Sequence, residues 1–193
     1  MSSGLRIGTA AELRPTLLTF LFTDVEGSTR LWQRYRDGMG PALARHDELI
    51  KRLVAEHRGE LVRPRGRGDS RFAVFGRASD AVAGACAIQL ALIQEPWTLP
   101  EPLRVRMAIH TGEAQLRLGD YYGPAVNHCA RLRAAAHGGQ VLVSMVTADL
   151  VRESLAAELT LRDLGEHQLK DLEQPERIWQ LLHADLGTHR CRH

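Results

Sequence analysis

The stretch Leu17–Arg30, with the sequence LLTFLFTDVEGSTR, constrains the fold of this chain more than any other. Leu17–Phe22 is apolar except for Thr19. This pattern favours a strand buried on both faces, although a short buried helical segment has the same pattern. The run stops at Asp24 and leads into a Gly-Ser-Thr turn. Ser28 is a residue type preferred as a helix N-cap, so we predict a strand, a tight turn and a helix.

This arrangement of a strand, an acid and a helix start suits a phosphate ligand that carries a metal ion. The Asp24 carboxylate can hold a hard cation, and the unpaired amides at the start of a helix can face phosphate oxygens. The plainer interpretation is a capped helix start that binds nothing. The rest of the chain has to distinguish the two.

Length and composition restrict the class of protein. A chain of 193 residues with 44% hydrophobic and 25% charged residues is expected to form one globular domain with a substantial core. A net charge of +2 favours neither nucleic acid nor a membrane surface as partner. The three cysteines, Cys86, Cys129 and Cys191, are too few and too unevenly spaced for a disulfide framework or a zinc site. With no apolar run of about 18 residues and no signal peptide, we expect a soluble cytoplasmic protein.

Hydrophobic periodicity predicts alternating helices and strands. Beyond the opening motif, helices are predicted over Leu43–Val54, Ala78–Gln94, Ala125–Ala136 and Met145–Ser154. Strands are predicted in a hairpin around residues 65–69 and over Leu103–His110, Glu113–Leu118, Gln140–Val143, Leu159–Leu164 and Glu176–Leu182. A turn at Thr111-Gly112 would join the second and third of these, and Asp120–Pro124 has turn chemistry.

The predicted order is β-α-α-β-β-α-β-β-α-β-α-β-β. Two hairpins among helices indicate a mixed, largely antiparallel sheet with helices packed on it, which is an α+β fold. We expect residues 1–14 to be a flexible arm, residues 15–183 the folded domain and residues 184–193 a disordered tail.

Asp69 repeats the pattern of Asp24, because it is an acid at a glycine-bearing turn between strands. If the strand of Leu17 lies beside that hairpin, the two carboxylates converge at one end of the sheet. A divalent cation relieves the repulsion between them, and two Mg²⁺ ions held by paired Asp residues serve in-line displacement at phosphorus. The alternative is an ordinary turn, since Gly-Asp is a common turn dipeptide.

Asn127 and Arg131 are four residues apart in a predicted helix and therefore project from one face. Arg can neutralise charge on a phosphoryl group in the transition state, and Asn can orient a sugar or a water. The alternative is a solvated helix face. The apolar residues Val126, Cys129 and Leu132 around the pair argue against a fully exposed face.

Arg65 and Asp120 form another candidate pair, one a hydrogen-bond donor and the other an acceptor at neutral pH. An acidic side chain that accepts a hydrogen bond from the amino group of adenine, beside a basic side chain that donates one to a ring nitrogen, can recognise the edge of this nucleobase. The alternative is ordinary surface charge in an arginine-rich stretch. Lys170 can reach a polyphosphate, but it can equally be a solvated lysine at the end of a strand.

Three segments in this order, FLFTDVEGST, GRGDSRFAVF and GDYYGPAVNHCARL, resemble the catalytic domain of class III nucleotidyl cyclases, especially bacterial and mycobacterial members. The resemblance extends from about Thr16 to Leu182 and includes the ending LGEHQLKDLEQPERIWQL. It implies a ferredoxin-like α+β core and head-to-tail homodimers with active sites at the subunit interface. Residues 15–183 are then the cyclase catalytic domain.

The resemblance also implies roles for the opening motif. Asp24 and Asp69 match the two metal-binding aspartates, with the Val25 carbonyl near the second ion. Two Mg²⁺ or Mn²⁺ ions per active site are therefore expected. The residues that match the triphosphate-binding turn are Glu26, Gly27, Ser28 and Thr29.

The other half of the site follows from the same resemblance. Asn127 and Arg131 match the pair that orients the ribose and stabilises the pentavalent phosphorus, and Asp120 matches the acid that selects adenine. Arg65 is a departure, because adenylyl cyclases usually have a Lys there, and the planar Arg fork is not a conservative exchange. We interpret Arg65 as a weakened adenine selector. Leu172 lies near the place where some members have a triphosphate-binding Lys, a role for which Lys170 is the substitute candidate.

These residues together predict a homodimeric adenylyl cyclase that converts ATP to 3′,5′-cyclic AMP and pyrophosphate. The alternative, favoured by Arg65, is a cyclase-like domain that binds nucleotide or partner proteins with little turnover. A guanylyl cyclase is a further alternative, which Asp120 argues against. Neither nucleic acid nor membrane is expected as a partner of this chain.

Overall fold

The computed structural model describes residues 16–62, 68–170, 172 and 174–185. The predicted N-terminal arm, Arg65 and most of the predicted tail lie outside these residues. Within the described part, helices and strands alternate in the predicted order, although the predicted strands Leu103–His110 and Glu113–Leu118 form one continuous strand. None of the described helices has both the length and the apolar character needed to cross a membrane.

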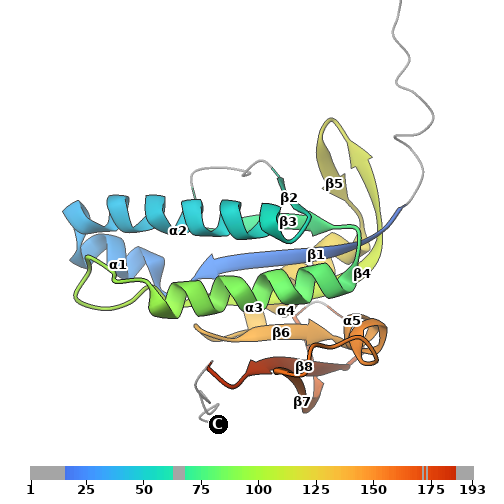
Figure 1. Cartoon of the computed structure of the whole chain (residues 1–193). Helices are drawn as coiled ribbons and strands as arrows, with labels where there is room; N and C mark the ends of the chain where they lie inside the picture. The colour runs from blue at the N-terminus through green and yellow to red at the C-terminus, as the bar shows by residue number, and fades with distance from the viewer. Residues whose placement is uncertain (1–15, 63–67, 171, 173, 186–193) are drawn as a thin grey trace, which may run out of the picture.

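One sheet forms the centre of the molecule (Figure 1). Its strands are β1 (Thr16–Val25), β2 (Gly59–Val62), β3 (Arg71–Phe75), β4 (Val105–Arg117), β5 (Asp120–Tyr122), β6 (Val141–Ser144), β7 (Leu159–His167) and β8 (Glu176–His183). They are arranged in the order β2-β3-β1-β4-β6-β8-β7, and β5 pairs with β4 outside this path. The strand pairs are antiparallel except β4 with β6, which confirms the predicted α+β fold with its largely antiparallel sheet.

Helices cover both faces of the sheet. They are α1 (Ser28–Arg34), α2 (Arg36–Glu56), α3 (Ala78–Gln94), α4 (Pro124–Ala135) and α5 (Met145–Val151). The long helices α2 and α3 lie in front of the sheet in Figure 1, and α4 lies behind it. Two separate apolar cores result, one under α2, α3 and α5 and the other under α4.

Strand β1 contributes to both cores. Phe20 packs in the core under α4, whereas the next residue, Leu21, packs in the core under α2 and α3. Both side chains are almost completely buried, because successive residues of a strand point to opposite faces of the sheet. The prediction of a strand buried on both faces is therefore confirmed. Only its start is open to solvent, where Leu17 is exposed.

The predicted turn at Thr111-Gly112 is wrong, because β4 continues through both residues to Arg117. Thr111 pairs with Thr19 of β1, and their hydroxyl groups are hydrogen-bonded at 2.9 Å. The chain turns later, at Leu118 and Gly119, where both φ angles are positive. The hairpin partner of β4 is β5, a segment predicted as a turn.

Gly112 has a different role from the one predicted. A Cβ atom at this position would lie 2.6 Å from the Cβ atom of Ala125 in α4. The glycine therefore permits close packing of the helix on the strand and does not mark a turn.

The prediction of Ser28 as a helix N-cap is also wrong. The N-cap of α1 is Gly27, and Ser28 is the first residue of the helix. Gly27 adopts a left-handed conformation with φ of 67°, which glycine reaches without steric cost. The turn therefore depends on backbone conformation, with no capping hydrogen bond from a side chain.

Candidate active site

The sheet brings Asp24 and Asp69 to the same end of the molecule. Asp24 is near the end of β1, and Asp69 lies just before β3, which runs antiparallel to β1. The Asp69 Oδ2 atom accepts a hydrogen bond of 3.1 Å from the Val25 amide. The Ser70 hydroxyl donates to the Asp24 Oδ1 atom at 2.8 Å. Adjacent strands thus place the two acids together, as the hairpin position predicted.

Two arginines contact the Asp24 carboxylate, and sequence reasoning identified neither of them. Arg106, opposite Asp24 in the ladder of β1 and β4, donates from Nε to Oδ2 at 2.7 Å. Arg133, from α4, places its Nη1 atom 3.0 Å from Oδ1 and 3.1 Å from the Ser70 hydroxyl. The Asp24 side chain is 11% exposed, and those of Arg133 and Arg106 are 20% and 30% exposed, so the guanidinium groups neutralise Asp24 in a partly desolvated environment.

A third arginine holds the loop of Asp69 in place. Arg71 donates from Nη1 to the carbonyl oxygens of Gly68 and Ser70, each at 2.8 Å. Its Nη2 atom forms a short ion pair with Asp47 of α2. The loop that presents Asp69 is therefore fixed to a long helix through one buried guanidinium group.

The turn that follows Asp24 is anchored at Glu26. The Glu26 amide donates to the Arg104 carbonyl at 2.8 Å, and its carboxylate accepts from the Gly138 amide at 2.9 Å. This side chain therefore contacts the segment between α4 and β6. Gly27 and Thr29 are exposed and Ser28 is half-buried, and all three lie just after Asp24 in the chain.

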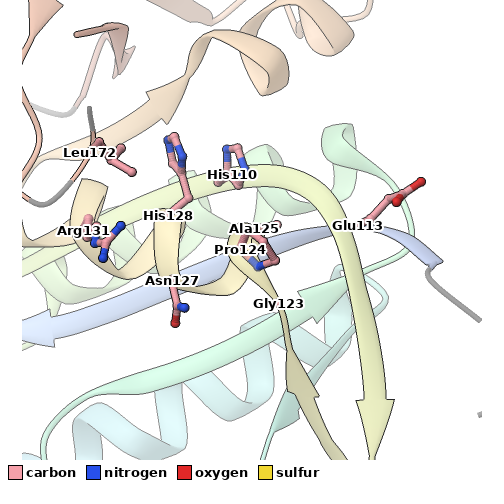
Figure 2. A pocket seen from close by; sticks show the side chains of 9 residues that line it. All are labelled: His110, Glu113, Gly123, Pro124, Ala125, Asn127, His128, Arg131 and Leu172. Atoms are coloured by element: carbon pink, nitrogen blue, oxygen red, sulfur yellow. The ribbon is translucent and has the colours of Figure 1, made fainter. Parts of the chain in front are cut away.

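Asn127 and Arg131 line a different part of the surface, a cavity of about 810 Å³ that we call the α4 cavity (Figure 2). The cavity is lined by His110, Glu113, Gly123, Pro124, Ala125, Asn127, His128, Arg131 and Leu172. Asn127 is exposed and Arg131 is half-buried, and both come from the same side of α4, one turn apart. The structure thus confirms that the two residues share a helix face.

Two other predicted site residues, Asp120 and Lys170, lie outside the lining of the α4 cavity. Asp120 begins β5, and its Oδ1 atom accepts from the Tyr121 amide at 2.8 Å. Lys170 is exposed, whereas Leu172 lines the α4 cavity. Among the described lining residues of this cavity there is no Asp24, Asp69, Asp120 or Lys170. The structure therefore groups the proposed metal residues in one place and the Asn127–Arg131 pair in another.

The wall of the α4 cavity contains a pair of histidines that sequence reasoning did not identify. The rings of His110 and His128 are stacked, with centroids 4.1 Å apart. His110 is buried, and its Nδ1 atom is hydrogen-bonded to the Ser144 hydroxyl at 2.9 Å. Burial, helped by the charge of His128, lowers the pKa of His110 to about 4, so its imidazole is neutral near pH 7.

The family of the chain follows from comparison with known proteins. The family model for the adenylate and guanylate cyclase catalytic domain matches residues 14–183. The chain therefore belongs to the class III adenylate and guanylate cyclase catalytic domain family. It is similar to an uncharacterised protein of Mycobacterium tuberculosis, with 45% identity over 177 residues that cover 91% of this chain. It is also 30% identical to an adenylate cyclase of Podospora anserina, over 90% of this chain and 11% of that protein.

The chain spans about 60% of the length of its mycobacterial relatives, whose whole-length properties therefore do not transfer to it. Solved structures agree with the fold. An adenylate cyclase of Trypanosoma brucei in its monomeric state is 29% identical, with a TM-score of 0.76 over 86% of this chain and 89% of that one. An adenylate/guanylate cyclase/hydrolase of Silicibacter pomeroyi is 31% identical, with a TM-score of 0.75 over 89% of this chain and 99% of that one.

Proposed function

We propose that the chain is an adenylyl cyclase domain that converts ATP to 3′,5′-cyclic AMP and pyrophosphate as a homodimer. The proposal rests on the positions of two separate groups of residues, each of which would form one half-site of an active centre. Asp24 and Asp69 lie together at one end of the sheet, and Asn127 and Arg131 line the α4 cavity. A second copy of the chain, placed head to tail, would bring one half-site against the other.

The donor chemistry at Asp24 and Asp69 fits Mg²⁺ or Mn²⁺, because two carboxylates and the nearby backbone offer the oxygen ligands that hard cations prefer. When bound, two ions would activate the ribose 3′-hydroxyl for in-line attack on the α-phosphorus and stabilise the pyrophosphate leaving group. In this reaction a bond forms between the 3′-oxygen and the α-phosphorus, and the bond to the bridging oxygen of the β-phosphate breaks. The hydroxyl proton goes to solvent.

The chain's own residues would position the nucleotide. The turn of Glu26, Gly27, Ser28 and Thr29 is next to Asp24 and would lie along the triphosphate, and the Val25 carbonyl would lie near the second ion. Asn127 of the second copy would orient the ribose. Arg131 of that copy would donate to the phosphoryl oxygens, whose charge grows in the transition state.

Base selection would depend on Asp120, which can accept from the adenine amino group but not from the carbonyl group that guanine has at that position. Arg65, which lies outside the described residues, would donate to the adjacent ring nitrogen. Lys170 is exposed near the α4 cavity residue Leu172 and would approach the triphosphate.

A direct assay tests the proposal. Purified protein is incubated with ATP or GTP and with Mg²⁺ or Mn²⁺ at several protein concentrations, and both cyclic products are measured. We expect cyclic AMP, formed at a rate that rises faster than linearly with protein concentration because two chains share each site. Asp24→Ala should abolish the product. Activity retained in a folded Asp24→Ala variant would refute the metal assignment.

A second candidate is a cyclase-like domain that binds nucleotide with little turnover. The contacts of Arg106 and Arg133 with Asp24 favour it, because both carboxylate oxygens already have cationic partners. In the same assay this function predicts nucleotide binding without cyclic product, and a guanylyl cyclase predicts product from GTP.

A further inference from the structure

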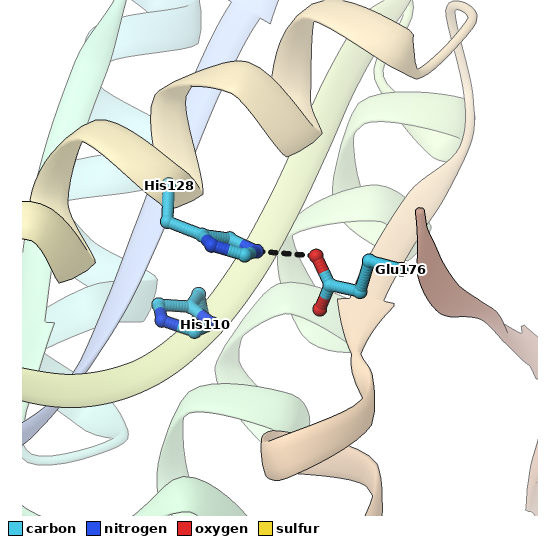
Figure 3. Close-up of side chains that lie close together, drawn as sticks. All are labelled: His110, His128 and Glu176. Carbon is cyan, nitrogen blue, oxygen red and sulfur yellow. Dashed lines mark hydrogen bonds and ion pairs between the residues drawn. The ribbon is translucent and has the colours of Figure 1, made fainter. Parts of the chain in front are cut away.

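One group of metal-ligand side chains lies apart from Asp24 and Asp69. His110 of β4, His128 of α4 and Glu176 of β8 each offer a ligand atom, and these atoms lie within 4.8 Å of one another. Figure 3 shows His128 and Glu176 pointing toward each other, with the His110 ring alongside that of His128. Three elements that are distant in sequence thus bring two imidazoles and one carboxylate together.

The orientation of His110 is fixed by the fold. Its Nδ1 atom is hydrogen-bonded to the Ser144 hydroxyl, which lies 3.1 Å from the Thr147 hydroxyl in turn. This leaves Nε2 as the nitrogen that can bind a ligand. Histidines that bind metals usually have the second ring nitrogen held by such a hydrogen bond, which sets the direction of the first.

His128 and Glu176 share a short hydrogen bond between Nε2 and a carboxylate oxygen. A metal cation could take the place of the proton between them, with the imidazole nitrogen and the carboxylate oxygen as its ligands. Both side chains are only partly exposed, and His110 and His128 line the α4 cavity. A metal ion between them would therefore be reachable from the cavity.

We propose that His110, His128 and Glu176 form a binding site for Zn²⁺ or a similar first-row transition metal. Two histidines and one carboxylate are a common donor set of zinc sites that keep a fourth position open. The two rings are stacked, so His128, which is at the cavity wall, would tilt to direct its nitrogen to the same ion as His110. Mg²⁺ prefers oxygen ligands only, so this site differs in metal preference from Asp24 and Asp69.

The position predicts an effect on catalysis, and this part alone rests on the proposed function. His128 follows Asn127 directly and faces the same cavity as Arg131. An ion bound there would occupy the space next to the pair that is proposed to hold the ribose and phosphate. We therefore expect micromolar Zn²⁺ to inhibit the cyclase.

Metal binding by itself is the primary test. Metal-free protein is titrated with Zn²⁺ by calorimetry and with Co²⁺ by visible absorption, which reports four-coordinate geometry. A Cys191→Ser background removes a thiol that can bind the same metals. We expect one site per chain, with binding about 100-fold weaker in His128→Gln and in Glu176→Gln, because loss of even an outer partner costs about 10- to 100-fold.

His137→Gln is the matched control, because it removes an exposed histidine just after α4 and should bind like the parent. Asp24→Asn should also retain the Zn²⁺ site, even if it abolishes activity, so the two proposals fail separately. Circular dichroism establishes that each variant is folded. The proposal is overturned if the parent binds no Zn²⁺ at micromolar concentration, or if folded His128→Gln and Glu176→Gln bind it as the parent does.

Discussion

Arg133 of α4 forms an ion pair with Asp24 at the end of β1, with 3.0 Å between Nη1 and Oδ1. Arg106 holds the other oxygen of the same carboxylate. A divalent cation at Asp24 would therefore compete with these two guanidinium groups for the carboxylate oxygens. The Nε atom of Arg133 is buried and has no hydrogen-bond partner among the described residues, which makes this arginine the more easily displaced of the two.

Arg133→Met should therefore increase the affinity for Mn²⁺. Without the competing guanidinium group, we expect binding to tighten by about tenfold, which corresponds to about 1.4 kcal/mol. The metal-free variant should also lose about 1–3 kcal/mol of unfolding free energy, because a charged hydrogen bond to Asp24 is lost. Electron paramagnetic resonance of free Mn²⁺ and thermal unfolding with and without Mn²⁺ measure both effects.

Arg52→Met is the matched control for Arg133→Met. Arg52 pairs with Glu56 on the exposed surface of α2, far in sequence from the acids. This pair should contribute little to stability and nothing to Mn²⁺ binding. Equal Mn²⁺ affinity in the parent and in Arg133→Met would mean that Arg133 does not compete with the metal.

Gly112→Ala should destabilise the protein by about 1–3 kcal/mol, because a new methyl group would be forced against Ala125 in a packed interface. Since Ala125 lies in the first turn of α4, the helix of Asn127 and Arg131, we also expect a lower turnover number. Urea unfolding and the cyclase assay measure the two effects. The double variant Gly112→Ala with Ala125→Gly should recover stability, and Gly76→Ala, which meets no atom within 4 Å, should be neutral. A stable Gly112→Ala single variant would contradict this account of the packing.

Acid should weaken the fold through His110. In the unfolded chain this histidine has a pKa of about 6.5 and is therefore protonated below about that pH. In the folded chain the pKa of His110 is lowered to about 4, because burial and the neighbouring His128 oppose the positive charge. The contribution of neutral His110 to the unfolding free energy is therefore fully present above pH 6.5 and is lost as the pH falls toward 4. Between pH 7.5 and pH 5 the loss from His110 should be about 2 kcal/mol.

Urea unfolding of the parent and of His110→Asn at both pH values measures this loss. The variant has lower stability at pH 7.5 because packing is lost, so the informative quantity is the change with pH. We expect that change to be smaller in His110→Asn than in the parent. An identical pH dependence in the two proteins would show that His110 does not titrate in this way.

Arg65→Lys should raise turnover or the preference for ATP over GTP. Lys has a compact ammonium group, whereas the planar Arg fork is bulkier at a position that pairs with an adenine ring nitrogen. We expect an increase of up to about tenfold in one of the two quantities, equivalent to about 1.4 kcal/mol. Steady-state rates with both nucleotides measure it. No change in either quantity would leave Arg65 without a role in base selection.

The order of helices and strands could be predicted because it depends on local signals, such as the apolar run of β1 and the Pro124 that begins α4. The meeting of Asp24 and Asp69 could also be predicted, since it needs only one strand beside one hairpin. The prediction of a turn at Gly112 was wrong, because a glycine that allows close packing cannot be told from one that allows a turn by its local sequence.

Contacts between distant segments could not be predicted in this way. Nothing near Arg133 in the sequence indicates that its side chain reaches Asp24, since that contact depends on how α4 crosses the sheet. The grouping of His110, His128 and Glu176 likewise needs three elements to be placed in space. The roles of Asp120, Asn127 and Arg131 in catalysis stay predictions.

Helix α4 has Arg131 and Arg133 about 200° apart around its axis, at 3.6 residues per turn. One faces the α4 cavity and the other faces Asp24 of the same chain. In the proposed dimer, a small rotation of this single helix would alter the metal half of one active site and the ribose half of the other at the same moment. Any signal that turns α4 would then switch both catalytic centres together, without needing to touch a nucleotide.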